Sequence, residues 1–233
     1  MPQFVSMSGT EINIDAGDIG PVPSLLVAPL RVAACFVMAH GAGAGMTHPF
    51  MATVATQLAD RGIATLRFDF PYMAKGLRRP DKPATAQAAV RAAVAEADRL
   101  LPSVPLIAGG KSFGARMTSQ AQAEAPMPGV RGLVFLGFPL HPAGKPSDGR
   151  ALHLERVALP MLFLQGTRDK LADLGFLVPV VERLGPRATL TLINQGDHSL
   201  HVPKRSGRTD ATALGEALDV MAAWVAALAV QGA

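Results

Sequence analysis

The stretch PLIAGGKSFGAR, residues 105–116, is the most informative part of the chain. Its apolar first half is typical of a buried β-strand, and the pattern G-x-S-x-G follows at Gly110–Gly114, where a helix is expected to begin. Glycines on both sides of a serine allow the sharp strand-to-helix turn that lifts the serine hydroxyl clear of a sheet. The sequence therefore predicts a nucleophilic Ser112. The alternative is a glycine-rich turn whose serine only caps the helix.

On either side of this turn, short apolar runs alternate with longer amphipathic segments, as in repeated βα units around a parallel sheet. We expect one α/β domain over residues 1–233, with a mostly parallel central sheet and helices on both faces. Residues 3–9 and 11–15 are expected to form an N-terminal hairpin or edge strands. The predicted strands are residues 24–28, 32–39, 64–70, 105–110, 131–138, 160–166 and 188–193. The predicted helices are residues 48–61, 84–101, 113–124, 171–184 and 210–229.

Composition excludes several classes of protein. The chain has 233 residues, is 49% hydrophobic and carries a net charge of +4. Its basic residues are scattered, which does not indicate a nucleic-acid surface, and its apolar runs are shorter than the ~20 residues of a membrane span. The first residues lack a secretory signal, so a cytoplasmic location is expected. The single cysteine, Cys35, lies in an apolar run and is expected to be a packing thiol. The oligomeric state stays open.

A nucleophilic serine needs a general base and a carboxylate that orients the base. His198 follows the last predicted strand in the turn GDHS, and Asp169 follows the preceding strand in GTRD. The carboxyl ends of parallel strands meet at one edge of a sheet, so Ser112, Asp169 and His198 are expected to lie together there. Asp169 is preferred to three other acids in this half of the chain: Asp148, Asp173 and Asp197.

Acyl transfer also needs donors for the oxyanion that develops on the substrate. The run HGAGAG, residues 40–45, follows the predicted strand 32–39, and its small residues let the backbone approach a substrate closely. We expect one donor to be the amide of Phe113, next to the nucleophile, and the other to be the amide of Ala42, with Gly43 as second choice. His40 is expected to bond within the loop rather than to act as the base.

Two cofactor motifs fail on inspection. A phosphate-binding G-x-x-x-x-G-K-S ending at Ser112 would need glycine at position 105, which is Pro105. A dinucleotide-binding G-x-G-x-x-G started at Gly41 meets Met46, and started at Gly43 it meets His48. The sequence therefore predicts neither an organic cofactor nor a metal.

Strings longer than these motifs resemble a family of small α/β hydrolases similar to dienelactone hydrolases. They are residues 40–51, 67–83, 109–116, 137–146, 162–169 and 196–207. The resemblance implies the α/β-hydrolase fold, with Ser112, Asp169 and His198 as the catalytic triad. The eukaryotic relatives of this family include a testis-expressed hydrolase-like protein and a subunit of a chromatin acetyltransferase complex. Dienelactone hydrolases use cysteine as nucleophile, so their lactone substrate is not carried over.

Expectations about the entrance concern residues 141–159 and several cations. Residues 141–159 lie between two predicted strands, 131–138 and 160–166, where a lid would be inserted. The segment has scarcely room for one average helix of ~11–12 residues with its connections, so the site is expected to have no lid or a minimal one. Its residues are expected to form one wall of the entrance. Five cations are expected near the mouth and would favour an anionic group on the substrate. They are Arg78, Arg79, Lys145, Lys204 and Arg205.

The function expected from these residues is that of a serine hydrolase, which cleaves a small carboxylic ester or thioester through an acyl-enzyme. The alternative is a non-catalytic interaction module on the same fold, because a fold does not by itself determine function.

Overall fold

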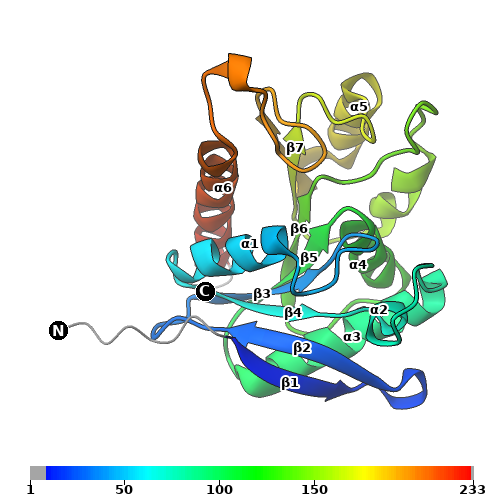
Figure 1. Cartoon of the computed structure of the whole chain (residues 1–233), viewed down its shortest axis with the longest axis vertical. Helices are drawn as coiled ribbons and strands as arrows, with labels where there is room; N and C mark the ends of the chain where they lie inside the picture. The colour runs from blue at the N-terminus through cyan, green and yellow to red at the C-terminus, as the bar shows by residue number, and fades with distance from the viewer. Residues whose placement is uncertain (1–8, 232–233) are drawn as a thin grey trace.

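The computed structural model describes residues 9–231, with side chains as far as residue 228. In this part of the chain eight strands form one sheet in the order β1-β2-β4-β3-β5-β6-β7-β8 (Figure 1). The pairs β1–β2 and β2–β4 are antiparallel, and every other pair is parallel. The strands are β1 (Thr10–Asp15), β2 (Pro21–Val27), β3 (Ala34–Ala39), β4 (Ile63–Phe68), β5 (Leu106–Lys111), β6 (Val130–Leu136), β7 (Met161–Gly166) and β8 (Ala188–Ile193).

Helices cover both faces of this sheet (Figure 1). On one face lie α1 (Pro49–Ala59) and α6 (Asp210–Gln231). The other face is covered by α3 (Pro83–Leu100), α4 (Phe113–Glu124) and α5 (Leu174–Leu184). The shorter elements are α2 (Pro71–Ala74) and the 3₁₀ helices η1 (Gly17–Ile19), η2 (Gly149–Arg156), η3 (Gly185–Arg187) and η4 (Lys204–Ser206).

Burial explains why the central strands read as continuous apolar runs. Every residue of β3, β4, β5 and β7 is buried, because helices pack on both faces of these strands. The edge strand β8 has only its last residue, Ile193, buried. This arrangement confirms the predicted α/β-hydrolase fold and aligns the carboxyl ends of β3, β5, β7 and β8 along one edge.

Helix α6 is long and apolar enough to span a membrane by length and composition alone, over Asp210–Leu228. Its buried residues Ala213, Ala217 and Met221 are spaced four apart, with Leu214 and Leu218 beside them on the same face, and they pack against the sheet. This stripe is the pattern of a helix that closes one face of a core.

The predicted elements are all present among the described residues, with shifted boundaries. The hairpin is β1 and β2, while residues 3–8 of its expected first part lie outside the described residues. Helix α5 begins at Leu174 rather than 171 because Asp173 caps it, accepting the Gly175 N–H at 2.8 Å. The elements α2, η1, η2, η3 and η4 were not predicted, since segments this short have too few residues for a periodic pattern.

Candidate active site

Ser112 lies at the sharp turn between β5 and α4, with φ 52° and ψ −113°. This is a strained conformation for a residue with a side chain. The two glycines of the motif are required for a different reason. A Cβ on Gly110 would lie 2.0 Å from the carbonyl oxygen of Ala39, and a Cβ on Gly114 would lie 2.3 Å from the same oxygen. The glycines therefore let the turn pack directly on β3.

A hydrogen-bonded chain joins Ser112, His198 and Asp169. The Nε2 atom of His198 lies 2.8 Å from Ser112 Oγ, and its Nδ1 atom lies 2.7 Å from Asp169 Oδ2. A carboxylate only accepts, so Nδ1 carries the proton and Nε2 is free to accept from the serine hydroxyl. The three residues follow β5, β8 and β7, as the parallel topology requires.

Asp169 is buried and held on both of its oxygens. Its Oδ1 atom accepts the Leu171 N–H at 2.7 Å, and its Oδ2 atom also accepts a hydrogen bond from the side-chain amide of Gln165. Gln165 is itself oriented by the Phe138 N–H, which donates to its Oε1 at 2.9 Å. The sequence analysis missed this glutamine, although a polar residue near the end of the apolar strand MLFLQG is the signal that could have found it.

The other three acids have different partners. Asp148 forms an ion pair with Arg183 at 3.0 Å on the surface. Asp173 caps α5 through the Gly175 N–H. Asp197 accepts two backbone N–H groups within its own turn. Of the four acids considered, Asp169 is the one hydrogen-bonded to the imidazole.

Two backbone amides are free to bind an oxyanion: that of Ala42 in the loop after β3 and that of Phe113 at the start of α4. The N–H of Gly43 donates to Tyr72 Oη at 2.8 Å and is therefore occupied. The N–H groups of Ala42 and Phe113 donate to no acceptor among residues 9–231. This distribution favours Ala42 over Gly43 as the partner of Phe113. Tyr72, which the sequence analysis did not single out, holds the loop in this arrangement.

His40 anchors the same loop. Its Nδ1–H donates to the Gly41 carbonyl at 2.7 Å, and its Nε2 accepts the Phe70 N–H at 3.1 Å. These partners require a neutral imidazole, and burial lowers the pKa of His40, which favours that form. His40 thus bonds within the protein rather than facing Ser112.

Two hollows flank His198. The first, here called the serine cavity, measures about 250 Å³. The second, here called the histidine groove, measures about 460 Å³ and, apart from one proline, is lined by charged and polar side chains. The serine cavity is lined by Gly41, Ala42, Ala44, His48, Phe50, Met51, Lys111, Ser112, Leu171, His198 and Ser199. The histidine groove is lined by Arg168, Lys170, Asp197, His198, His201 and Pro203.

The cations expected at the mouth are elsewhere. Each of the five is exposed, and none lines either hollow. The side-chain direction of an exposed loop residue does not follow from the strand it succeeds, which is why their positions in sequence misled. The cations that do line the hollows are Lys111, Arg168 and Lys170. The five cations that were expected at the mouth and line neither hollow are Arg78, Arg79, Lys145, Lys204 and Arg205.

Residues 141–159 do not form a wall of the entrance, contrary to expectation. No residue of this segment lines either hollow. Its helix η2 packs against α4, where His153 Nε2 lies 2.8 Å from Ser119 Oγ. Leu171, beyond β7, forms the wall that this segment was expected to supply.

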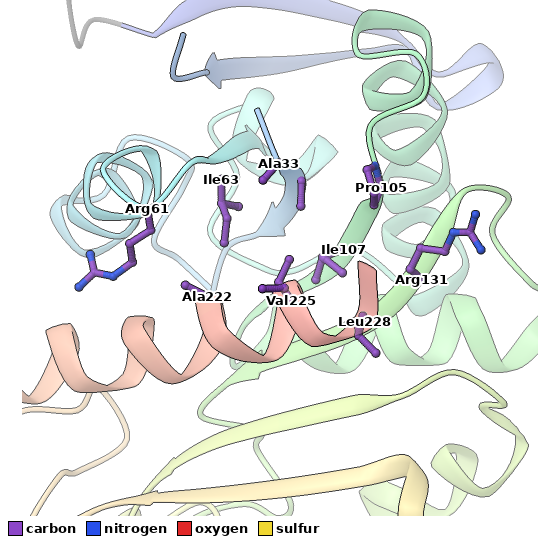
Figure 2. Close-up of a pocket in the computed structure, with 11 residues that line it drawn as sticks. Ala33, Arg61, Ile63, Pro105, Ile107, Arg131, Ala222, Val225 and Leu228 are labelled. Carbon is purple, nitrogen blue, oxygen red and sulfur yellow. The ribbon is translucent and has the colours of Figure 1, made fainter. Parts of the chain in front are cut away.

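A separate cavity of about 200 Å³ lies at the opposite edge of the sheet, between α6 and the amino ends of the strands (Figure 2). Its lining is apolar apart from Arg61 and Arg131. Arg61 is already paired with Asp219 at 2.7 Å. The described lining of this cavity contains no nucleophile, histidine or carboxylate.

Comparisons with known proteins agree with this fold. An α/β serine hydrolase without a lid from Xanthomonas campestris has a similar fold, with a TM-score of 0.72 and 22% identity over 96% of this chain and 98% of that one. A dienelactone hydrolase from Anabaena variabilis gives a TM-score of 0.72 and 21% identity over 93% and 97%. Est1E from Butyrivibrio proteoclasticus, solved with ferulic acid bound, gives 0.70 and 16% over 92% and 99%. A family model described as an alpha/beta hydrolase domain matches residues 32–226, and the chain belongs to this family.

Proposed function

We propose that the protein is a serine hydrolase that cleaves a carboxylic ester or thioester. Ser112 Oγ attacks the carbonyl carbon while His198 Nε2 takes the hydroxyl proton. The negative charge that forms on the carbonyl oxygen is stabilised by the N–H groups of Ala42 and Phe113. Asp169 orients the imidazole and stabilises its charged form.

The acyl-enzyme then forms and breaks down. The tetrahedral intermediate collapses, the bond to the leaving alcohol or thiol breaks, and His198 gives its proton to that group. Water, deprotonated by the same imidazole, attacks the acyl-Ser112 carbonyl; the bond to Ser112 Oγ then breaks, His198 returns the proton to Oγ, and the acid is released. The reaction as proposed requires neither a metal nor an organic cofactor, and its substrate is a small molecule.

The observation that carries the proposal is the continuous hydrogen-bonded chain from Ser112 Oγ through His198 to Asp169. A serine that only capped α4 would need no such partners, and its side chain makes no capping hydrogen bond. Relatives of similar fold include an esterase domain from Rhodothermus marinus and the dienelactone hydrolase named above. The relationship of this chain to the testis-expressed and chromatin-associated proteins stays a prediction.

The test is labelling with a fluorophosphonate probe, which phosphonylates an activated serine. We expect one labelled peptide, containing Ser112, and turnover of at least one member of a panel of esters and thioesters. A non-catalytic interaction module would leave the probe unreacted, and labelling at another serine would contradict the assignment.

Acyl-chain length provides a further prediction. The serine cavity, at about 250 Å³, lies below the ~300–1,000 Å³ that is usual for drug-sized ligands, and no residue of segment 141–159 lines it. Acetyl and butyryl esters of p-nitrophenol should therefore be hydrolysed at least about tenfold more efficiently, as kcat/KM, than the palmitoyl ester. A strong rise in rate on lipid emulsions would contradict this prediction.

We also propose that the substrate carries an anionic group, and that the cations that recognise it differ from the five expected from the sequence. Arg168 and Lys170 line the histidine groove beside the imidazole that must protonate the leaving group. A carboxylate on the leaving group should therefore raise kcat/KM at low salt, and added salt should reduce that advantage because it screens exposed charges.

The matched variants are Arg168→Ala and Arg79→Ala, compared on a carboxylated ester and its neutral analogue. Arg168→Ala should reduce the preference for the carboxylated ester several-fold, while Arg79→Ala should leave it unchanged. Equal responses of both esters to salt and to Arg168→Ala would exclude anionic recognition in the groove.

A further inference from the structure

Lys111 is a buried cation immediately before Ser112. It is the last residue of β5, and only 8% of its surface is exposed. Lysine is almost never this buried unless its ammonium group has a partner. Within the described part of the chain Lys111 forms no ion pair; its Nζ instead donates a hydrogen bond to the backbone carbonyl of His198.

The structure leaves a space of the right shape for this ammonium group. Gly137, just after β6, has φ 70°, and a Cβ there would lie 2.9 Å from both Lys111 Nζ and the His198 carbonyl oxygen. The ring of Phe50 in α1 lies 5.9 Å from Nζ, within the range of a cation–π contact. Two segments that are distant in sequence, those of Gly137 and Phe50, thus lie against the hydrogen bond between Lys111 and His198.

The hydrogen bond between Lys111 and His198 restrains a part of the site that lies outside regular secondary structure. His198 lies in an irregular turn after β8, two residues before Leu200, a residue with positive φ. Nothing in regular secondary structure fixes the imidazole relative to Ser112. A misplacement of about 1 Å in such a site can cost about 100-fold in rate.

We propose that Lys111 is a positioning residue for the hydrolase reaction: by holding the carbonyl of His198, it fixes the imidazole relative to the Ser112 hydroxyl one residue away. The inference rests on the proposed function. No step of the proposed mechanism uses this lysine of the sequence G-K-S-F-G. The inference is that turnover nevertheless depends on it.

The charge of Lys111 makes this role sensitive to pH. Burial lowers the pKa of Lys111 to about 8, although the negative charges of Asp169 and Asp197 act to raise it. The other titratable groups at the serine cavity are His48 and His198. An ammonium donor forms a stronger hydrogen bond than a neutral amine, so the bond to His198 weakens as pH rises through about 8.

The contribution of Lys111 to stability increases as pH rises above about 8, whereas its contribution to activity decreases. The pKa of Lys111 in the folded chain, about 8, lies below its ordinary value of 10.5. Between these values the unfolded chain binds more protons, so the contribution of Lys111 to the free energy of unfolding increases as pH rises. A lysine with a purely structural role would show this change in stability without the accompanying loss of turnover.

The experiment compares Lys111→Met, Lys111→Arg and the wild type, with Lys75→Met as the matched control. Lys75 is exposed at the end of α2 and lines neither hollow. For a short-chain ester, we expect Lys111→Met to lower kcat by about 10- to 100-fold with KM changed less than about threefold, and to lose the decline in kcat near pH 8. Lys111→Arg, which stays charged, should retain more of kcat than Lys111→Met and also lose that decline.

Two outcomes would overturn the inference: a folded Lys111→Met with kcat within about threefold of the wild type, or a decline near pH 8 that persists in Lys111→Met. If Lys111→Met does not fold, persistence of the decline in Lys111→Arg decides against the proposal.

A measurement on the resting protein separates this inference from the proposed function. The ring resonances of His198 in NMR spectra should shift with a midpoint near pH 8 in the wild type and lose that shift in Lys111→Met. If the shift occurs but no ester is hydrolysed and no probe reacts, the hydrolase proposal fails while the contact stands. If ester is hydrolysed and the shift is absent, the inference about Lys111 is wrong.

Discussion

Ser112→Ala should lower kcat for ester hydrolysis by about 10⁴-fold or more and abolish fluorophosphonate labelling. The hydroxyl is the proposed nucleophile, and removing it leaves only binding and the oxyanion donors to assist attack by water. The melting temperature should change little, because the lost atom faces the serine cavity rather than the core.

His198→Ala is the companion variant for this prediction. Residues of a triad act as a unit, so the double variant should be scarcely worse than either single variant. Wild-type turnover in Ser112→Ala would remove the central claim. Additive losses in the double variant would show that the two residues act independently.

Asp169→Asn should lower kcat by about 10³- to 10⁴-fold, for a reason visible in the hydrogen bonds. The Leu171 N–H donates to Oδ1, whereas the Gln165 amide and the His198 Nδ1–H both donate to Oδ2, so the NH₂ group of an asparagine would face a donor at either position. With the NH₂ group at the Oδ1 position, the neutral amide would no longer stabilise the imidazolium; with it at the Oδ2 position, His198 Nδ1 would have to accept and Nε2 would carry the proton. An imidazole in that tautomer cannot take the proton of Ser112.

Asp148→Asn is the matched control for this substitution. Asp148 is an acid of the same half of the chain, and it pairs with Arg183 on the surface away from the imidazole. Its removal should change kcat less than about twofold. The two variants are compared by steady-state kinetics on one short-chain ester. Equal losses in Asp169→Asn and Asp148→Asn would contradict the assignment of the acid.

The sequence alone identified the fold and the three residues that the structure joins. Glycines at positions 110 and 114 are local requirements of one sharp turn, and the alternation of apolar and amphipathic segments in chain order predicts parallel strands. Asp169 and His198 could be chosen because each follows a strand in that order. Such inferences need only the chain direction and the rule that parallel strands end at one edge.

Only the tertiary structure decided which side chains surround those residues. Gln165, Tyr72 and Lys111 act on partners 4, 29 and 87 positions away, respectively, through bonds that no local pattern encodes. The same limit explains the misplaced cations: Arg79 was expected at the mouth, whereas Arg168 lines the groove. Backbone direction follows from local sequence, but the direction of a surface side chain depends on packing between distant segments, which exists only once the chain has folded.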